Sequence, residues 1–302
     1  MAPTHAAVMK AVLTDARFSD PDWIFERKLD GIRCVAIRDG GPVRLLSRND
    51  LALNGRFPAV AEALDAQRRT RFAVDGEVVA LVGDDQTSFQ ALGTRGARLA
   101  YFVFDVLWLD GEDVRSRPLL ERKALLRDAL AFRDPLRFTE HVAGDGERLY
   151  ADACRNGWEG VIAKRAASPY APGRSRDWLK FKCQQGQELV IGGYTAPRGT
   201  REHFGALLVG VYDADTLRYA GKVGTGFDRA TLRSLGARLR ELERPDAPFA
   251  DAPHYRDATW VEPELVAQIG FAEWTAAGRL RHPRFLGLRE DKPAREVVRE
   301  GK

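Results

Sequence analysis

Short apolar runs rich in β-branched and aromatic residues recur through the first 183 residues, which predicts a chain built mainly of β-strands. The apolar runs end at clusters of Gly, Pro, Asn and Asp, and Asp39-Gly40-Gly41 indicates a hairpin. The expected strands cover approximately residues 22–27, 32–38, 43–48, 72–81, 99–109, 158–165 and 178–183. Helical spacing predicts helices at 57–68, 118–130 and 147–156, whereas we expect 1–21 to be irregular and 166–176 to be a loop.

The pattern changes after residue 183. A polar segment is followed by short expected strands at 188–194, 205–212, 216–223 and 258–261, with one expected helix at 228–242 and a loop at 245–253. A small barrel of about five strands interrupted by one helix is typical of an OB fold. We therefore predict an α+β chain with two domains, residues 1–183 and 184–302.

The composition indicates a globular chain without a membrane segment. Of its 302 residues, 44% are hydrophobic and 30% are charged, which is enough for two separate cores. No apolar run approaches the ~20 residues that span a bilayer, and the first ten residues lack the apolar centre of a signal peptide. The net charge of +4 and the pI near 9.0 permit a polyanionic partner without requiring one.

The three cysteines, Cys34, Cys154 and Cys183, lie far apart and form no Cys-x-x-Cys pair. This spacing predicts neither a zinc site nor a disulfide framework, and it fits a reducing cytosol. Abundant Ala and a preference for Arg over Lys suggest a GC-rich bacterial genome. We therefore expect a bacterial cytoplasmic protein.

One short stretch, Glu26-Arg27-Lys28-Leu29-Asp30-Gly31-Ile32-Arg33, carries the strongest chemical signal. Apolar runs on both sides predict two strands, with Lys28 at a tight corner between them and Gly31 supplying unusual backbone dihedrals. A lone loop lysine is usually a solvated cation. As a nucleophile, Lys28 would need burial or a nearby cation to lower its pKa.

Acidic side chains interrupt two of the apolar strands. Asp75-Gly76-Glu77 lies within one strand, and Glu159 begins another. Because an unpaired buried carboxylate is costly, these acids either face solvent at a bulge or serve a purpose. A glutamate at the start of an apolar strand suits a metal ion that faces both protein and phosphate.

Further candidates follow from alternation along strands. Phe102 and Phe104 share one strand face, which more often means core than a stacking platform. Lys180 and Lys182 share a face opposite Leu179 and Phe181, and two like charges side by side favour a bound anion. Such cations would also lower the pKa of Lys28.

These stretches resemble, in the same order along the chain, six motifs of ATP-dependent DNA ligases and mRNA capping enzymes. The first is Lys-x-Asp-Gly-x-Arg, and the last is Arg289-Glu290-Asp291-Lys292. The resemblance implies a nucleotidyltransferase (ATP-grasp-like adenylation) domain of antiparallel sheets with helices, followed by an OB-fold barrel. It also implies that Lys28 attacks the α-phosphate of ATP and carries AMP as a phosphoramidate.

The resemblance assigns the remaining roles residue by residue. It implies metal binding by Glu77 and Glu159, and contact of Arg48 with a DNA phosphate. It places the α-phosphate near Lys180 and Lys182, and a purine on Phe104. The nucleotide-binding set that it implies is Glu26, Arg33, Glu77, Phe104, Lys180, Lys182, Arg289 and Lys292.

Sequence around the motifs looks most like the ligase domain of bacterial DNA ligase D, which acts in nonhomologous end joining. The segments that carry this likeness include Val190-Ile191-Gly192-Gly193-Tyr194 and Gly287-Leu288-Arg289-Glu290-Asp291-Lys292-Pro293. The likeness implies ATP and Mg²⁺ or Mn²⁺ as cofactors, nicked or broken duplex DNA as substrate, and Ku and a repair polymerase as partners. We expect a monomer near the nucleoid. The 302 residues include no polymerase or phosphoesterase module and no large N-terminal DNA-binding domain, so a stand-alone ligase and an excised domain both remain open.

Two alternatives remain open at this point. An RNA ligase or a GTP-dependent capping enzyme would use the same lysine chemistry. A non-catalytic DNA-binding module of OB type is of another class, and the intact set of acids and lysines argues against it.

Overall fold

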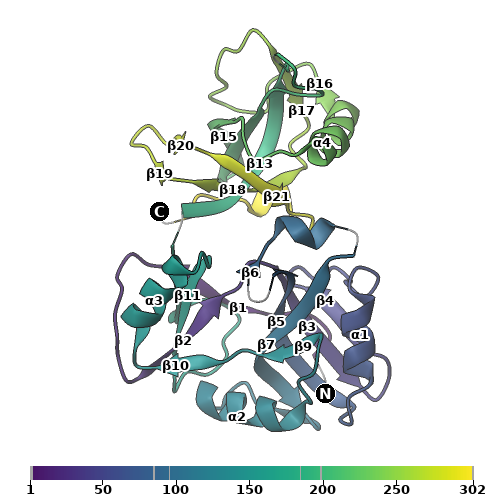
Figure 1. The fold of residues 1–302 in the computed structure, drawn as a ribbon, viewed down its shortest axis with the longest axis vertical. Helices are drawn as coiled ribbons and strands as arrows, with labels where there is room; N and C mark the ends of the chain where they lie inside the picture. The colour runs from purple at the N-terminus through teal and green to yellow at the C-terminus, as the bar shows by residue number, and fades with distance from the viewer. Residues whose placement is uncertain (1–2, 84–85, 95, 184, 198, 301–302) are drawn as a thin grey trace. The chain divides into compact units, whose positions relative to one another are not determined.

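The computed structural model describes residues 3–83, 86–94, 96–183, 185–197 and 199–300. The chain divides into two compact units, Met1–Cys183 (unit 1) and Gln184–Lys302 (unit 2) (Figure 1). Gln184, the predicted first residue of the second domain, lies outside the described residues.

Unit 1 contains two β-sheets. The first has the order β1 (Met9–Leu13), β12 (Gly173–Lys182), β11 (Gly160–Arg165), β2 (Trp23–Lys28) and β10 (His141–Ala143). The second, called the seven-stranded sheet below, has the order β4 (Arg44–Ser47), β3 (Ile32–Asp39), β5 (Arg71–Val82), β7 (Arg98–Leu109) and β8 (Glu112–Asp113). Strand β6 (Gln86–Thr87) pairs with β5, and β9 (Leu136–Phe138) pairs with β7. Most pairs are antiparallel, whereas β1–β12 and β7–β9 are parallel.

Helices cover the outer face of each sheet. Val60 of α1 (Pro58–Asp65) and Leu126 of α2 (Leu119–Ala129) join the core on the seven-stranded sheet, and Ala153 of α3 (Gly146–Arg155) joins the core on the five-stranded sheet. A further cluster, which includes Phe104 and Trp178, joins the inner faces of the two sheets. The polar residues on these inner faces are therefore brought together inside unit 1. A short 3₁₀ helix, η1, covers Gln90–Gly93.

The chain crosses from one sheet to the other directly after Lys28. The predicted corner is present, but the reason given for Gly31 is wrong, because its φ is not in the left-handed region. A Cβ at Gly31 would lie 2.2 Å from the carbonyl oxygen of Val78. Close packing against β5, rather than dihedral freedom, therefore requires glycine here.

Two predictions about loops in unit 1 are also wrong. Residues 9–13 of the segment expected to be irregular form β1, and the expected loop at 166–176 ends early because β12 begins at Gly173. The two errors have one cause, since β1 and the start of β12 pair with each other. Parallel pairing between distant segments leaves no local pattern in the sequence.

The prediction of no disulfide is contradicted as well. Cys154 at the end of α3 and Cys183 after β12 form a disulfide with their Cα atoms 5.2 Å apart. The packing of α3 on the five-stranded sheet brings together two cysteines separated by 29 residues. Cys34 is a buried free thiol.

Unit 2 is a second β-structure with one helix, α4 (Arg229–Glu241). Its long strand β13 (Gln185–Thr195) pairs with β14 (Leu207–Asp213), β17 (Ala258–Val261) and β18 (Val266–Phe271). Further strands are β15 (Thr216–Val223), β16 (Glu243–Arg244), β19 (Glu273–Trp274), β20 (Leu280–Arg281) and β21 (Arg284–Leu288), and a 3₁₀ helix, η2, covers Ala294–Glu296. Strands β18 and β21 were not predicted, although they close one side of the core.

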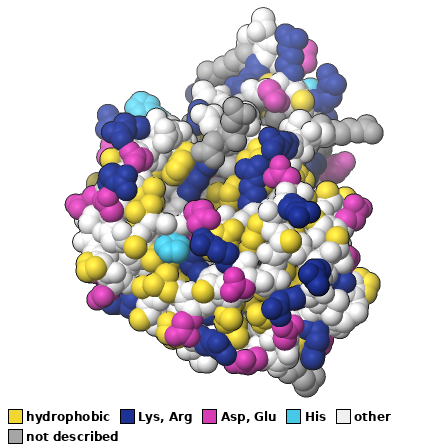
Figure 2. All heavy atoms as spheres, turned by 60° about the horizontal axis from the view of Figure 1, so that its bottom comes forward, with side chains coloured by type: hydrophobic (Ala, Val, Ile, Leu, Met, Phe, Trp, Pro, Cys, Tyr) yellow, Lys and Arg dark blue, Asp and Glu magenta, His cyan; other side chains and the backbone are white. Residues whose placement is uncertain are grey.

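Surface properties agree with the composition. Figure 2 shows cationic and anionic side chains interspersed on the face that it brings forward. Among the described residues, no helix is both long enough and apolar enough to cross a membrane.

Candidate nucleotide-transfer site

Lys28 lies at the end of β2, on the inner face of the five-stranded sheet. Alternation along β2 gives Glu26 the same face and sends Phe25 to the opposite core. The register places Lys28 opposite Gly160, and Gly160 opposite Lys182. Gly160 has a φ of +151°, and a Cβ there would lie 1.9 Å from the carbonyl oxygen of Phe181. The two lysines therefore flank a position that has no side chain.

The second lysine of β12 follows the predicted alternation. Lys180 is opposite Ile162, which is opposite Glu26, so Lys180 lies one row behind Lys182 on the same face. Phe181 and Leu179 pack into the core on the other face, as predicted. The inner face thus presents three lysines from two strands within a few residues of one another.

Lys28 forms an ion pair with Glu159, and this pair overturns the predicted pKa shift. Burial disfavours the charged amine, but Glu159, with help from Asp30 and Glu77, outweighs burial and raises the pKa of Lys28. The Lys28 side chain is only 17% exposed. The neighbouring lysines therefore do not lower the pKa of Lys28 here, because the Glu159 carboxylate lies closer and raises it.

Glu26 occupies a buried position between two lysines. Its carboxylate lies 2.6 Å from Nζ of Lys123 on α2 and 2.6 Å from Nζ of Lys164 on β11. Burial opposes ionisation of Glu26, but the two lysines outweigh it and lower the pKa of Glu26. Burial also lowers the pKa of Lys164 to about 8.

The seven-stranded sheet contributes a row of residues across three strands. Arg33 on β3 is opposite Glu77 on β5, and Glu77 is opposite Phe102 on β7. Two residues away, Asp75 is fully buried and accepts hydrogen bonds from Nε and Nη2 of Arg33, each 2.6 Å long. The possibility that both acids of Asp75-Gly76-Glu77 face solvent is therefore wrong for Asp75.

Phe104 connects the two sheets. A register shift between β5 and β7 falls at this residue, and its ring contacts Trp178 edge-on at a centroid distance of 6.0 Å. The guanidinium of Arg33 lies 4.6 Å from the ring centre and Nζ of Lys164 lies 4.2 Å from it. The residue is only 7% exposed, so these neighbours already cover most of the ring.

The acids near Lys28 suit a divalent cation. Glu77 and Glu159 both act on the charge of Lys28, one from each sheet. Within the described residues no three His, Cys, Asp or Glu side chains form a metal cluster. Mg²⁺ commonly takes one or two carboxylates and completes its shell with water and substrate phosphates, so this donor set fits it.

The other predicted residues lie elsewhere. Arg48 follows the end of β4 and is partly exposed. Arg289 and Lys292 belong to unit 2, where Arg289 pairs with Asp291 at 2.9 Å and Lys292 with Glu188 at 3.2 Å. Both line a pocket of about 310 Å³ in unit 2.

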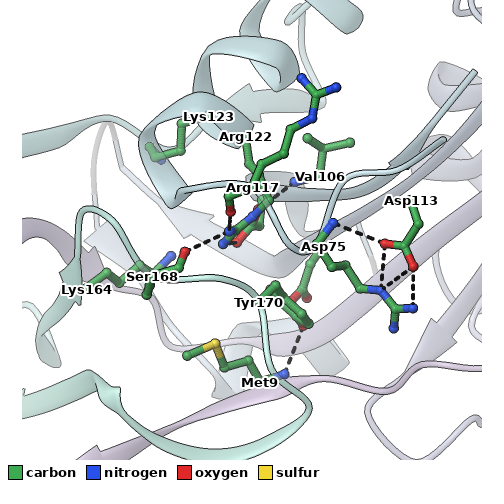
Figure 3. Close-up of polar contacts among 12 residues, drawn as sticks. Met9, Asp75, Val106, Asp113, Arg117, Arg122, Lys123, Lys164, Ser168 and Tyr170 are labelled. Atoms are coloured by element: carbon green, nitrogen blue, oxygen red, sulfur yellow. Dashed lines mark hydrogen bonds and ion pairs between the residues drawn. The ribbon is translucent and has the colours of Figure 1, made fainter.

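Sequence reasoning missed three buried polar residues. Arg122 and Lys123 occupy the apolar face of α2, and their i+3 and i+4 spacing from Leu119 could have indicated this. Tyr170 lies in the predicted loop, and nothing in its local pattern marks its burial. Figure 3 shows Arg122 of α2 bonded to Ser168 in the connection from β11 to β12, and Tyr170 of the same connection beside Asp75 of β5.

Two family models match the chain. Residues 3–182 match the model described as "ATP dependent DNA ligase domain", and residues 200–292 match "ATP dependent DNA ligase C terminal region". Together they favour a DNA ligase over an RNA ligase or a capping enzyme, and over a non-catalytic binding module. The chain therefore has a nucleotidyltransferase domain followed by a C-terminal OB-fold domain.

Similar full-length proteins agree. The chain is 44% identical over 292 residues to "Multifunctional non-homologous end joining protein LigD" of Pseudomonas aeruginosa, covering 92% of this chain and 35% of that protein. It is 38% identical over 307 residues to "Multifunctional non-homologous end joining DNA repair protein LigD" of Mycobacterium tuberculosis, covering 99% of this chain and 39% of that protein. The chain thus spans little more than a third of these relatives.

Solved structures complete the comparison. A "mycobacterial DNA ligase D complexed with ATP and MES" matches with a TM-score of 0.72 and 36% identity, over 98% of both chains. The ligase domain from M. tuberculosis LigD matches with a TM-score of 0.52 and 37% identity, again over 98% of both chains. This protein belongs to the family of ATP-dependent DNA ligases.

Proposed function

We propose that this chain seals breaks in duplex DNA through a lysyl-AMP intermediate on Lys28, as the ligase part of a nonhomologous end-joining protein. The observation that supports this assignment best is the row formed by Lys28, Gly160 and Lys182. This row puts a candidate nucleophile and a cation on either side of a position without a side chain. The end-joining role is inferred from the relatives, of which the chain covers only part.

The first step joins AMP to the enzyme. The neutral amine of Lys28 attacks the α-phosphorus of ATP, an N–P bond forms, and the bond to the β-phosphate oxygen breaks, so that pyrophosphate leaves. Lys28 must first release to solvent water the proton that Glu159 stabilises. Lys180 and Lys182 then offset charge on the α-phosphate, while Arg33, Glu26 and Phe104 hold the nucleoside.

Glu77 and Glu159 would hold Mg²⁺ or Mn²⁺, which offsets phosphate charge when bound. Engaging Glu159 in this way would also remove the group that raises the pKa of Lys28. Arg289 and Lys292 would contact the leaving pyrophosphate. Both are paired with carboxylates inside unit 2, so each would exchange an acidic partner for phosphate.

The second and third steps act on DNA. The 5′-phosphate at a break attacks the lysyl-AMP, the N–P bond breaks, and AMP becomes joined to the DNA end. The 3′-hydroxyl then attacks the 5′-phosphorus and AMP leaves. Arg48 would contact a DNA phosphate. DNA binding should therefore weaken as the salt concentration rises and should not depend on base sequence.

The remaining assignments extend the same proposal. The two domains would coincide with units 1 and 2, with boundaries at residues 183 and 184. Ku and a repair polymerase would be the partners, and the protein would act as a monomer on DNA in the bacterial cytoplasm, at the nucleoid.

The test is incubation with α-labelled ATP and Mg²⁺ or Mn²⁺, followed by denaturing electrophoresis. Pyrophosphate treatment first removes any AMP already bound. We expect the wild type and Lys222→Ala, an exposed lysine variant of unit 2, to be labelled, and Lys28→Ala to remain unlabelled. Labelled protein should then seal nicked DNA without further ATP. A label that survives Lys28→Ala, or that forms from GTP and not ATP, would refute the proposal.

A further inference from the structure

A buried polar chain reaches Arg33 from outside the predicted motifs. Tyr170, in the connection between β11 and β12, is 4% exposed. Its hydroxyl donates to Oδ2 of Asp75 at 2.5 Å and accepts from the backbone N–H of Met9 at 2.9 Å. Figure 3 shows Tyr170 lying between Met9 and Asp75. One hydroxyl thus links β1 to a buried carboxylate of β5.

That carboxylate fixes the direction of Arg33. Asp75 accepts from Nε and Nη2 of Arg33, and Nη2 also donates to the carbonyl oxygen of Met9 at 3.1 Å. A guanidinium held on two of its nitrogens has little rotational freedom. Its third nitrogen, Nη1, makes no hydrogen bond to the described residues and is available to a ligand.

A second route leads from Tyr170 to the same place through ring contacts. Tyr170 meets Trp178 edge-on at 5.8 Å, and Trp178 meets Phe104 edge-on at 6.0 Å. Arg33 lies over the Phe104 ring. The polar route and the ring route both end at Arg33 and Phe104, so a shift of Tyr170 would disturb both.

The connection that carries Tyr170 is itself anchored. The backbone N–H of Tyr170 donates to the carbonyl oxygen of Arg115 at 2.8 Å. Nearby, Nη1 of Arg122 donates to the carbonyl of Ser168 at 2.9 Å. Burial, together with Asp75, raises the pKa of Tyr170, which keeps its hydroxyl protonated and able to donate.

We propose that Tyr170 is a positioning residue for nucleotide binding, which acts through Asp75 to hold Arg33 against Phe104. The inference rests on the proposed function, because it requires that Arg33 contacts the nucleotide. Tyr170 itself touches neither nucleotide nor reacting atoms in this assignment.

The test measures ATP affinity by calorimetry in a Lys28→Ala background, which prevents chemistry. Tyr170→Phe removes only the hydroxyl, and we expect about tenfold weaker binding. Tyr101→Phe is the matched control. The buried hydroxyl of Tyr101 donates to the carbonyl oxygen of Cys34, on the face of the seven-stranded sheet opposite to Asp75. It should change affinity less than about twofold.

A double variant separates positioning from general destabilisation. In an Arg33→Ala background, Tyr170→Phe should have little further effect, because the residue through which it acts is gone. Equal losses in both backgrounds, or equal losses in Tyr170→Phe and Tyr101→Phe, would overturn the inference. Absence of ATP binding by Lys28→Ala alone would instead count against the proposed function.

Discussion

Lys28 and Glu159 form an ion pair between the end of β2 and the residue that precedes β11. Glu159 raises the pKa of Lys28 and so opposes its use as a nucleophile. If pairing were the only role of Glu159, then Glu159→Gln should speed labelling near pH 7.

We predict the opposite for Glu159→Gln, because Glu159 is also assigned to the metal. Removing a group that only supports a metal ligand already costs about tenfold or more in metal affinity or activity, so removing a ligand itself should slow labelling by at least that factor. The metal concentration for half-maximal labelling should rise. Glu140→Gln, an exposed acid paired with Arg127, is the control. Faster labelling with unchanged metal dependence would reduce Glu159 to an ion-pair partner.

Phe104→Leu should weaken ATP binding about tenfold or more, as expected for the loss of a base-stacking ring. Leucine is chosen because it limits the cavity that alanine would leave in the contact between the sheets. Phe138→Leu is matched, since that ring also lies near two cations, Lys123 and Arg127, but outside the site. Similar ATP affinities for the two variants would show that Phe104 serves only the core.

Asp105→Ala should lower the free energy of unfolding by about 3 to 5 kcal/mol, because it leaves a buried cation without its partner. Asp105 and Arg122 are both fully buried and bonded at 2.7 and 2.8 Å. Denaturant unfolding measures the effect. The exposed pair of Glu140 and Arg127 gives the comparison, and Glu140→Ala should cost less than about 1 kcal/mol. Equal losses of unfolding free energy in Asp105→Ala and Glu140→Ala would mean that burial does not make the Asp105–Arg122 pair more important for stability.

Lys164 should make stability depend on pH in alkaline solution. Its pKa is lowered to about 8 in the folded chain, against an ordinary value of 10.5. Between these values the unfolded chain binds more protons, so the contribution of Lys164 to stability rises with pH. The unfolding free energy of the wild type minus that of Lys164→Met should therefore become more positive from pH 8 to pH 10.5. A difference that stays constant would contradict the shifted pKa.

Cleavage of the Cys154–Cys183 disulfide should destabilise the chain, because the bond closes a loop of 29 residues. Loop-closure arguments give about 3 to 4 kcal/mol for this length. Cys154→Ser and reduced wild type should have the same lowered unfolding midpoint. Alkylation of the native chain should modify no cysteine before reduction, whereas Cys34 should react only after unfolding, because burial raises its pKa.

The sequence by itself determined the local elements and the chemistry carried by short motifs. Apolar runs predicted β2, β5 and β7, and alternation along β12 correctly gave Lys180 and Lys182 one face. The motif around Lys28 and the order of its partners predicted the family that the matches show. These features are local because each depends on the spacing of a few neighbouring residues.

Only the tertiary structure decided which groups meet. Parallel pairing of β1 with β12, the disulfide, and the burial of Tyr170 all join segments distant along the chain. The pKa of Lys28 was predicted in the wrong direction because charges interact through space. Lys182 is its neighbour across one strand, but the Glu159 carboxylate lies in direct contact with it. Distances across two sheets fix such balances, and no periodicity in a sequence records them.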